Sequence, residues 1–308
     1  YFFESEAAPL GKELVEQHPE VFSLSDGAWV FKGEEHGLHT RVFLNSEGLP
    51  TYEAKELALA KMKDDRFGGY DHSVVSTANE ITEYFKVLLC AMGFIYPELA
   101  KKTEHIGHGT VRLSSGKMSS RTGDVIAALD FIQEITEAAA SRIASSSPEL
   151  AKDQELAEAI ALGAIKYATL KGNILQDSVF NKEEALSFEG ASGPYLQYTH
   201  ARLTSVIEKA KTAGVTMGSG VPDVPYQVER ILYRFEEAVA EAARTRAPHL
   251  ITQYLTELAG TFNTFYAAEK IADQADRYAP YKLALAEATK QTLKNGLWLL
   301  GIKAPERM

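Results

Sequence analysis

The sequence predicts an α/β region followed by an all-α helical bundle, and three observations support this interpretation. Segments of helical period alternate with segments of strand period up to about residue 130. From Asp124 onward the strand pattern is absent and apolar residues recur at helical spacing. Glycines separate the first strands, as expected of turns. We therefore expect residues 1–130 to form an α/β domain with a parallel sheet, and residues 131–308 to form a helical domain.

The first region is expected to contain both helices and strands in alternation. Pro50 precedes a helix that Thr51 opens, and proline is common at the first positions of helices. The expected helices cover residues 10–17, 51–63 and 80–92. The expected strands cover residues 28–31, 40–44, 72–76 and 105–113. In a parallel sheet of this kind, a ligand binds at the carboxyl ends of the strands.

The second region is expected to consist of helices joined by loops. The segment from Gly214 to Pro225 is rich in glycine and proline and reads as a loop. The expected helices cover residues 124–145, 150–171, 192–212, 226–245, 248–270 and 280–300. One apolar stripe at helical spacing consists of Leu250, Leu255, Leu258, Phe262, Phe265 and Tyr266. The first long helix can brace both regions, so the boundary falls between 125 and 150.

The composition limits the class of protein. A chain of 308 residues is long enough for about two domains. The net charge of −10 argues against a non-specific nucleic-acid binder, but it leaves room for a local basic surface. No apolar run reaches the roughly 18 residues that cross a bilayer, so no membrane partner is expected. Cys90 is the only cysteine, which excludes disulfides within the chain and favours a reducing cytoplasm.

The stretch from Gly116 to Gly123 carries the clearest chemistry. It reads Gly-Lys-Met-Ser-Ser-Arg-Thr-Gly, and it follows a predicted strand and precedes a predicted helix start at Asp124. It offers a lysine, an arginine, three hydroxyls and backbone N–H groups near a helix N-terminus, which are the groups that bind phosphate. A polar surface loop is the alternative for a stretch of this composition.

The string from Lys117 to Gly123 resembles the second signature of class I aminoacyl-tRNA synthetases, in the form carried by arginyl-tRNA synthetases. In that family the loop closes over the ATP phosphates. The usual signature has a second lysine where this chain has Ser120, and the arginyl enzymes commonly differ there. The resemblance implies that Lys117 stabilises the pyrophosphate charge and contacts ATP. It also implies ATP contacts from Met118 and Ser119, and a catalytic role for Ser119, Ser120 and Arg121 in shaping the loop.

Tyr52 and Glu56 form a second candidate site. They are four residues apart on the helix that opens at Thr51, so they share a face. A carboxylate beside a phenol ring can bind a guanidinium, but a solvated helix face has the same pattern. The segment 51–58 resembles the arginyl-tRNA synthetase segment in which a tyrosine and an acid hold the substrate arginine. The family usually has Asp where this chain has Glu56.

The letters His105-Ile106-Gly107-His108 spell the first class I signature, but we interpret them as a coincidence. The genuine signature opens a helix after the first strand of the nucleotide-binding fold, whereas these residues run into a predicted strand. His108 remains a candidate for lining the ATP pocket, because it lies close to Lys117 in the sequence. A zinc site formed by His105 and His108 would need further ligands, and none accompanies them.

The second region also resembles the arginyl-tRNA synthetases. The segment 193–202, Gly-Pro-Tyr-Leu-Gln-Tyr-Thr-His-Ala-Arg, is similar to the start of their anticodon-binding domain, and the tail from Leu299 to Met308 is similar to their carboxyl terminus. Aromatic and Met side chains stack on unpaired bases. The resemblance implies tRNA contacts from Tyr226, Tyr266 and Met308. Helical periodicity alone would place Tyr266 in the core.

The resemblance implies ATP-dependent ligation of L-arginine to tRNA(Arg), with Mg²⁺ accompanying ATP, by a cytoplasmic protein that we expect to be a monomer. The chain begins at Tyr1 without an initiator Met, so we expect a fragment that lacks the first signature and does not activate arginine alone. Two alternatives remain open. One is another class I synthetase, such as the cysteinyl enzyme, although Cys90 lacks partners for zinc. The other is a non-catalytic helical tRNA-binding or scaffold protein.

Overall fold

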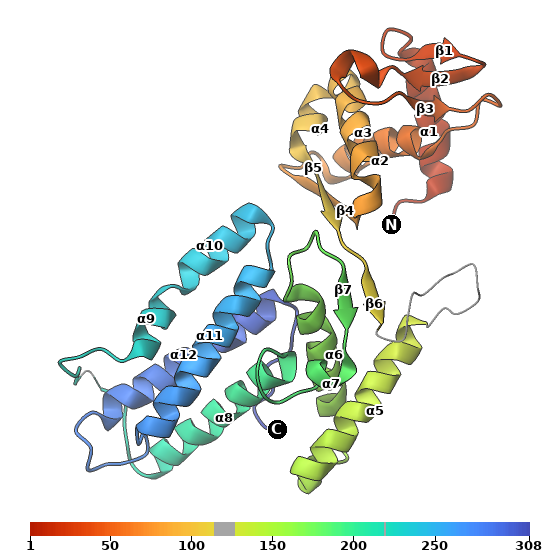
Figure 1. Cartoon of the computed structure of the whole chain (residues 1–308). Helices are drawn as coiled ribbons and strands as arrows, with labels where there is room; N and C mark the ends of the chain where they lie inside the picture. Colours follow the sequence, from red (N-terminus) through yellow and green to blue (C-terminus); the bar gives the residue numbers. More distant parts are fainter. Residues whose placement is uncertain (114–126, 219) are drawn as a thin grey trace. The chain divides into compact units, whose positions relative to one another are not determined.

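The computed structural model describes residues 1–113, 127–218 and 220–308 (Figure 1). The chain forms two compact units, Tyr1–Gly109 and Thr110–Met308, which are described separately below. The first unit is α/β and the second is mainly helical, as the sequence predicts. The functional boundary expected near residue 130 stays a prediction, because compactness alone does not assign a function to the segment between 110 and 130.

The first unit contains helices and two small sheets (Figure 1). Its α-helices are α1 (Glu4–Gln17), α2 (Tyr52–Phe67), α3 (Thr82–Ile95) and α4 (Pro97–Lys102), with 3₁₀ turns η1 (Gly33–His36) and η2 (Asn79–Ile81). Its strands are β1 (Ser23–Ser25), β2 (Ala28–Phe31), β3 (Arg41–Leu44), β4 (Ser73–Ala78) and β5 (Thr103–His108). Strands β1, β2 and β3 pair antiparallel, and β4 pairs with β5 in parallel.

The expectation of one parallel sheet was therefore wrong for the first three strands. Strands β1 and β2 are joined only by Asp26 and Gly27, whose φ angles are 48° and 80°. Two such residues make a tight turn, and a turn this short can join only antiparallel neighbours. Strands β4 and β5 are parallel because η2, α3 and α4 lie between them in the chain and provide the crossover.

Helix α2 lies at the centre of the first unit's core. It buries Ala54, Leu57, Ala58 and Ala60. Helix α1 packs closely against it at Gly11, where an added Cβ would lie 2.4 Å from the carbonyl oxygen of Ala54. Helix α3 contributes Phe85, Val87, Leu88, Ala91 and Met92 to the same core. This packing fixes the position of the α2 amino terminus, where the candidate residues Tyr52 and Glu56 lie.

The second unit is built from helices and a two-stranded parallel sheet (Figure 1). The sheet consists of β6 (Val111–Leu113) and β7 (Ser178–Phe180). The helices are α5 (Ala128–Ser146), α6 (Gln154–Leu170), α7 (Lys182–Ala185), α8 (Gly193–Thr212), α9 (Gln227–Tyr233), α10 (Phe235–Thr245), α11 (His249–Ala268) and α12 (Ala279–Leu299), with the 3₁₀ turn η3 (Pro148–Leu150). Its main core lies among α8, α9, α11 and α12.

Three expectations for these elements were wrong in detail. The strand expected over 105–113 is two strands, because β5 pairs with β4 in the first unit whereas β6 pairs with β7 in the second. Strand β7 lies beyond residue 124, where no strand was expected; it has only three residues, too few to show an alternating pattern. The helix expected over 226–245 is divided at Arg234 into α9 and α10.

Helices α6 and α8 approach each other through glycines. A Cβ on Gly193 would lie 2.2 Å from the carbonyl oxygen of Gly163, and a Cβ on Gly163 would meet the amide of Gln197 at 2.5 Å.

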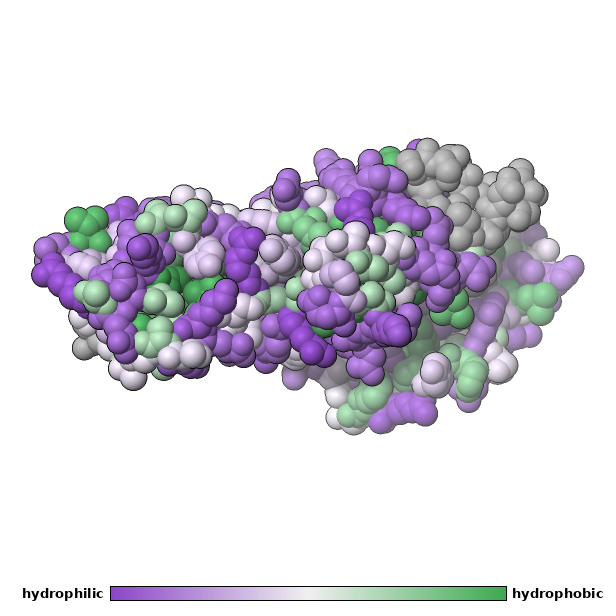
Figure 2. Space-filling view, turned by 90° about the horizontal axis from the view of Figure 1, so that it is seen from below, coloured by the Kyte–Doolittle hydropathy of each residue, from purple (hydrophilic) through white to green (hydrophobic). Residues whose placement is uncertain are grey.

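Hydrophilic residues cover most of the face seen in Figure 2, and hydrophobic residues lie on it in smaller groups. The apolar side chains of each unit are thus mainly used in packing.

An ion pair joins the antiparallel sheet to α2, with the Glu53 side chain buried and the Arg41 side chain 37% exposed. Arg41 on β3 lies 2.8 Å, nitrogen to oxygen, from the Glu53 carboxylate in the first turn of α2. Glu53 is only 5% exposed. The Arg41 guanidinium also lies over the Tyr84 ring of α3, 5.3 Å from its centroid. A carboxylate in such a place is stable in its charged form only while the cation remains.

We predict that Arg41→Met lowers the free energy of unfolding of the first unit by about 3 kcal/mol, because it leaves Glu53 buried without its cation. The double variant Arg41→Met/Glu53→Leu should recover most of that loss. Urea titration followed by Trp29 fluorescence measures this unit alone if Trp298, which is largely exposed in the second unit, is first replaced by Phe. Equal losses in the single and double variants would contradict the prediction.

Candidate functional site

The amino terminus of α2 places Tyr52 and Glu56 on successive turns. Tyr52 is the first residue of the helix and is 72% exposed, and the ammonium nitrogen of Lys55 lies 5.2 Å from its ring centroid. Glu56 lies one turn further in and is partly buried. The exposed ring and the partly buried acid together provide the two chemical groups that a guanidinium requires.

The carboxylate of Glu56 is held in a low-dielectric place. Burial raises the pKa of Glu56 above its usual range, and the nearby charge of Lys63 offsets part of this effect. Burial also lowers the pKa of Lys63, whose ammonium donates a hydrogen bond to the Ser73 hydroxyl on β4 at 2.9 Å. No hydrogen bond or ion pair to the Glu56 carboxylate comes from the residues that the structure describes. Glu56 is therefore a carboxylate available to an incoming cation.

Tyr84 on α3 belongs to the same cluster, although no sequence pattern singles it out. Its pKa is raised mainly by burial, and also by the negative charges of Glu56 and Glu53. Tyr52 adds to the same electrostatic environment. A tyrosine inside an apolar helix is usually a core residue, so only the packing of α3 on α2 reveals its place. Arg41 on β3 was also missed, because its pairing with Glu53 and its contact with the Tyr84 ring form only when β3, α2 and α3 pack together.

Lys117, Met118, Ser119, Ser120 and Arg121 lie outside the described residues, so their predicted roles stay predictions. The strand that leads to them is fixed by Asp177. One Asp177 carboxylate oxygen accepts from the backbone N–H of Thr110 at 2.8 Å, and the other accepts from the Arg112 guanidinium at 2.6 Å. Strand β6 thus has a defined position before the chain enters the segment 114–126.

The letters His105 to His108 lie within β5, as the sequence predicted, and not at a helix start. The His105 ring stacks on Phe85 with 4.0 Å between centroids, and its Nε2 is 2.7 Å from the Thr77 hydroxyl. His108 is exposed, and its Nδ1 lies 2.9 Å from the Gly109 carbonyl oxygen. His105 is thus a packing residue, and the ATP contact of His108 stays a prediction.

A cavity of about 390 Å³ in the second unit contains Met308. Its lining consists of Ile143, Ser146, Ser147, Ile160, Phe188, Glu189, Tyr198, Arg202 and Met308. The Arg202 guanidinium lies 4.7 Å from the Tyr198 ring centroid and donates to the Asn263 amide oxygen at 2.8 Å. Asn263 is a neutral partner, so the charge of Arg202 is not cancelled by this contact. The cavity combines aromatic and thioether groups with one cationic side chain, Arg202, and one anionic side chain, Glu189.

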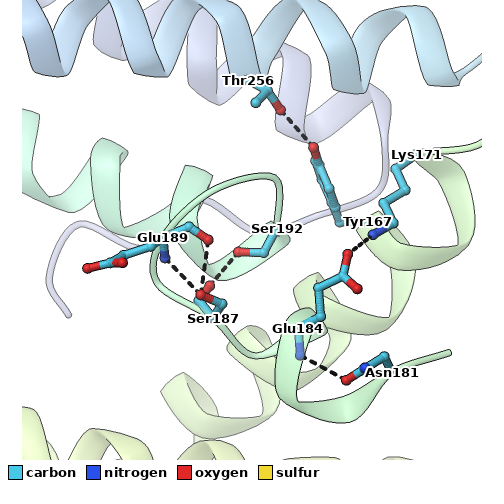
Figure 3. A network of polar contacts seen from close by, with 8 residues as sticks. All are labelled: Tyr167, Lys171, Asn181, Glu184, Ser187, Glu189, Ser192 and Thr256. Carbon is cyan, nitrogen blue, oxygen red and sulfur yellow. Dashed lines mark hydrogen bonds and ion pairs between the residues drawn. The ribbon is translucent and has the colours of Figure 1, made fainter. Parts of the chain in front are cut away.

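A network of polar contacts shapes the loop that carries Phe188 (Figure 3). The Ser192 hydroxyl caps α8 by accepting from the Tyr195 N–H, and it donates to the carbonyl oxygen of Ser187. The Ser187 hydroxyl accepts from the Glu189 N–H at 3.1 Å. These bonds fix the turn that brings Phe188 to 6.1 Å from the Tyr198 ring, centroid to centroid.

The other two predicted tRNA contacts lie outside this cavity lining. Tyr266 on α11 is 37% exposed and stacks on Phe262, with 6.2 Å between centroids. Tyr226 precedes α9, and its ring meets Phe265 edge to face at 4.9 Å. The structure therefore groups Met308 with Tyr198 and Arg202, two residues of the sequence segment 193–202. Neither had been assigned a tRNA contact.

The described residues contain no group of three or more His, Cys, Asp or Glu side chains suited to hold a metal ion. Within the same residues, no helix is both long and apolar enough to cross a membrane.

Comparison with known proteins identifies the class. Residues 13–182 match the family described as tRNA synthetases class I (R), catalytic domain, and residues 196–308 match the DALR anticodon binding domain. These two matches define a class I aminoacyl-tRNA synthetase. The chain belongs to the arginyl-tRNA synthetase family, which excludes the cysteinyl alternative.

Individual relatives cover the whole chain. It is 32% identical to the arginine–tRNA ligase of Porphyromonas gingivalis and 31% identical to that of Clostridium acetobutylicum, with 100% of this chain and 54% of each relative aligned. The arginyl-tRNA synthetase of Thermus thermophilus has a TM-score of 0.79 at 30% identity over 99% of this chain and 58% of that one. The enzyme of Plasmodium falciparum, at 20% identity and a TM-score of 0.80, shares the fold. The chain spans about half the length of the curated relatives that it matches.

We predict that Glu56→Gln does not destabilise the chain at neutral pH. A raised pKa in the folded state means that the contribution of Glu56 to stability is fully present below its unfolded value of 4.5 and is lost as the pH rises through the folded value. The Gln variant lacks this loss. The difference between its melting temperature and that of the parent should therefore increase in favour of the variant as the pH is raised from 4 to 7.

Glu53→Gln is the matched control, because Glu53 lies on the same helix but is paired with Arg41. It should lower the melting temperature at pH 7. Melting curves of the three proteins at several pH values make the comparison. If Glu56→Gln lost stability relative to the parent as the pH rose, the electrostatic description of this carboxylate would be wrong.

Proposed function

We propose that the protein ligates L-arginine to tRNA(Arg) at the expense of ATP. The observation that carries the proposal is the availability of Glu56. It is a partly buried carboxylate with no partner among the described residues, and it lies within the part of the chain that matches the class I (R) catalytic domain. The relatives' printed name, arginine–tRNA ligase, agrees with this chemistry.

The reaction has two steps. The arginine carboxylate attacks the α-phosphorus of ATP and releases pyrophosphate, and a hydroxyl of the terminal ribose of tRNA then attacks the arginyl carbonyl and releases AMP. Neither step requires a protein nucleophile, so catalysis is positioning and charge stabilisation. We propose that Mg²⁺ arrives with the ATP phosphates, since no described cluster of side chains is suited to hold it.

In this proposal Glu56 accepts two N–H bonds from the guanidinium of the substrate, and the exposed Tyr52 ring flanks it. A planar guanidinium matches a carboxylate in this paired manner, whereas an ammonium does not. The Arg41 side chain provides an internal example of this kind of binding, because its guanidinium pairs with the Glu53 carboxylate and lies over the Tyr84 ring. Lys117, with Met118 and Ser119, would contact ATP, while Ser120 and Arg121 shape the loop.

The Met308 cavity is proposed to take part of the tRNA anticodon arm. Tyr198, Phe188 and Met308 offer surfaces on which an unpaired base can stack. Arg202 faces the cavity with a neutral partner and can bind a phosphate or a base edge. Glu189 lines the same cavity, so Arg202 supplies one phosphate-binding group there and the lining is not a basic patch.

We predict that Glu56→Gln raises the KM for arginine by about 10- to 100-fold, because hydrogen bonds to charged groups are worth about 1.5–3 kcal/mol. Glu56→Asp, which keeps the charge, should lose less. Arginine binding should also weaken as the pH falls through the raised pKa of Glu56, since only the ionised carboxylate binds the cation. Arginine-dependent pyrophosphate exchange measures the KM, with lysine and citrulline as competitors.

A suitable enzyme for this assay joins the preceding half of the Clostridium acetobutylicum relative to this chain. The 308-residue chain alone is expected to give no exchange. The residues His105–His108, which spell the first class I signature, lie in strand β5 and not at a helix start. The relatives are about twice as long as this chain. An unchanged KM in Glu56→Gln would remove Glu56 from the arginine site. Exchange with lysine or citrulline as readily as with arginine would contradict the proposed function.

We predict that Tyr198→Ala and Met308→Ala each weaken tRNA(Arg) binding by about 5- to 100-fold, because stacking on one base is worth about 1–3 kcal/mol. Arg202→Met should weaken binding and reduce the slope of log Kd against log salt by about one. Filter binding of a tRNA(Arg) transcript at several salt concentrations provides both quantities. Tyr233→Ala is the control, since Tyr233 is 91% exposed and lies outside the cavity lining.

A further inference from the structure

The carboxyl-terminal tail that follows α12 is fastened along one face of α8. Gln197, His200 and Thr204 occupy this face at helical spacing. The Gln197 amide donates to the Lys303 carbonyl oxygen at 2.9 Å, and His200 Nδ1 lies 2.8 Å from the Pro305 carbonyl oxygen. The Thr204 hydroxyl donates to the Glu306 carboxylate at 2.8 Å. These three side chains, which we call the tail clamp, bind successive points between residues 303 and 306.

Other contacts support the same path. Gly301 turns the chain with a φ of 67°, and the Lys166 ammonium on α6 donates to its carbonyl oxygen. Ile302 is buried in the core of the second unit. The Glu306 carboxylate also pairs with the Lys290 ammonium of α12 at 2.6 Å. Beyond this point the chain ends at Met308, which packs against the α5–α6 core and lines the cavity.

The clamp binds the tail mainly through backbone carbonyl groups, and it does so inside the protein. Gln197 and His200 are both fully buried. In the described structure the Gln197 Oε1 and His200 Nε2 atoms have no hydrogen-bond partner. Burying a polar atom without a partner is costly, and apolar side chains would fill the same volume without that cost. Gln197 also donates to the Ala159 carbonyl oxygen of α6, so the polar groups of the clamp hold the tail and, through Gln197, helix α6.

We propose that Gln197, His200 and Thr204 are positioning residues for tRNA binding: they hold the carboxyl-terminal tail so that Met308 lines the cavity beside Tyr198 and Arg202. This inference rests on the proposed tRNA function of that cavity. The clamp residues act through the tail and do not contact the nucleic acid. Loss of the clamp releases Met308, and the cavity then loses one of its walls.

His200 makes the clamp sensitive to pH. The Pro305 carbonyl can only accept, so Nδ1 carries the proton and Nε2 is bare in the neutral ring. Burial lowers the pKa of His200 below 6.5, and the Pro305 hydrogen bond and Glu306 oppose this effect. The other charged groups acting on it, Lys290 and Lys294 of α12, disfavour a second positive charge. A released tail exposes His200 to water, where it protonates more readily, so the free energy that holds the tail is largest above pH 6.5 and decreases as the pH falls below it.

The first experiment measures tail release without tRNA. The 308-residue chain is digested with a carboxypeptidase, and the release of free Met is timed between pH 5.5 and 8. His200→Leu, which has no donor for Pro305, should release Met up to about tenfold faster at pH 7.5, as the loss of one hydrogen bond allows. His200→Gln, whose amide can donate but does not titrate, should resemble the parent at pH 7.5 and lose the increase below pH 6.5.

The second experiment measures the Kd for a tRNA(Arg) transcript with the same proteins and with Met308 deleted. His200→Leu should weaken binding measurably but by no more than the deletion does, because the other tail contacts remain, and the double variant should bind no more weakly than the deletion alone, because both act through the same group. Melting curves identify any variant that does not fold. Thr204→Val, which removes the hydroxyl bonds to Glu306 and to the His200 carbonyl oxygen within α8, then replaces it as a milder test.

The outcomes separate the two proposals. If Met release is the same in His200→Leu and the parent, the tail clamp is wrong. If release is faster but tRNA binding is unchanged, or if the two losses add, the positioning role is wrong. If the parent chain shows the predicted release but binds no tRNA(Arg), the proposed function of the cavity fails while the clamp itself stands.

Discussion

The close approach of α6 and α8 is the constraint on which the second unit depends. Gly163 and Gly193 meet where no Cβ fits, and this contact leaves room for the Gln197 side chain against the α6 backbone. Gln197 donates to the Ala159 carbonyl oxygen of α6 and to the Lys303 carbonyl oxygen of the tail. One amide thus links two helices and the chain terminus. The Met308 cavity exists because these three segments are held at fixed spacing.

Two carboxylates on α2 show how stability and binding are divided in the first unit. Glu53 is buried and paired with Arg41, so its charge is satisfied within the protein. Glu56, three residues further along, is partly buried, and burial raises its pKa. The charge of Lys63 offsets part of this rise, and the Lys63 ammonium is hydrogen-bonded to Ser73. The first residue holds the helix against the sheet, while the second is left available. A partly buried carboxylate without an ion pair contributes less to stability than a paired one.

In an acidic chain, a cation that is not paired with a carboxylate is a candidate for binding phosphate. Many lysines and arginines of the described residues lie beside carboxylates, as in the Lys290–Glu306 and Arg112–Asp177 pairs. Arg202 instead binds a neutral amide and lies over an aromatic ring. A cation placed in this way keeps its attraction for phosphate while the surrounding acidic surface repels nucleic acid elsewhere. The net charge of −10 is therefore compatible with a specific tRNA site.

The sequence by itself determined the alternation of helices and strands in the first region, the mainly helical character of the second, and the family; it predicted Tyr52 and Glu56 as the residues of α2 that bind a guanidinium. These follow from periods of two and 3.6 residues and from short strings of specific residues, which are local properties of the chain. Its predictions for the segment 117–121 concern residues that the structure does not describe. The antiparallel pairing of β1 with β2 followed from the tight turn at Asp26 and Gly27, whose positive φ angles no periodicity records.

Only the tertiary structure decided which side chains meet. Tyr84 joins Glu56 because α3 packs on α2. Tyr198, Arg202 and Met308 line one cavity although Met308 lies far from the other two along the chain. From the sequence alone, His200 is one polar residue of an amphipathic helix. The structure shows that it binds the Pro305 carbonyl oxygen of the tail. Contacts of this kind depend on how helices pack through space, and a sequence pattern with a period of a few residues carries no information about them.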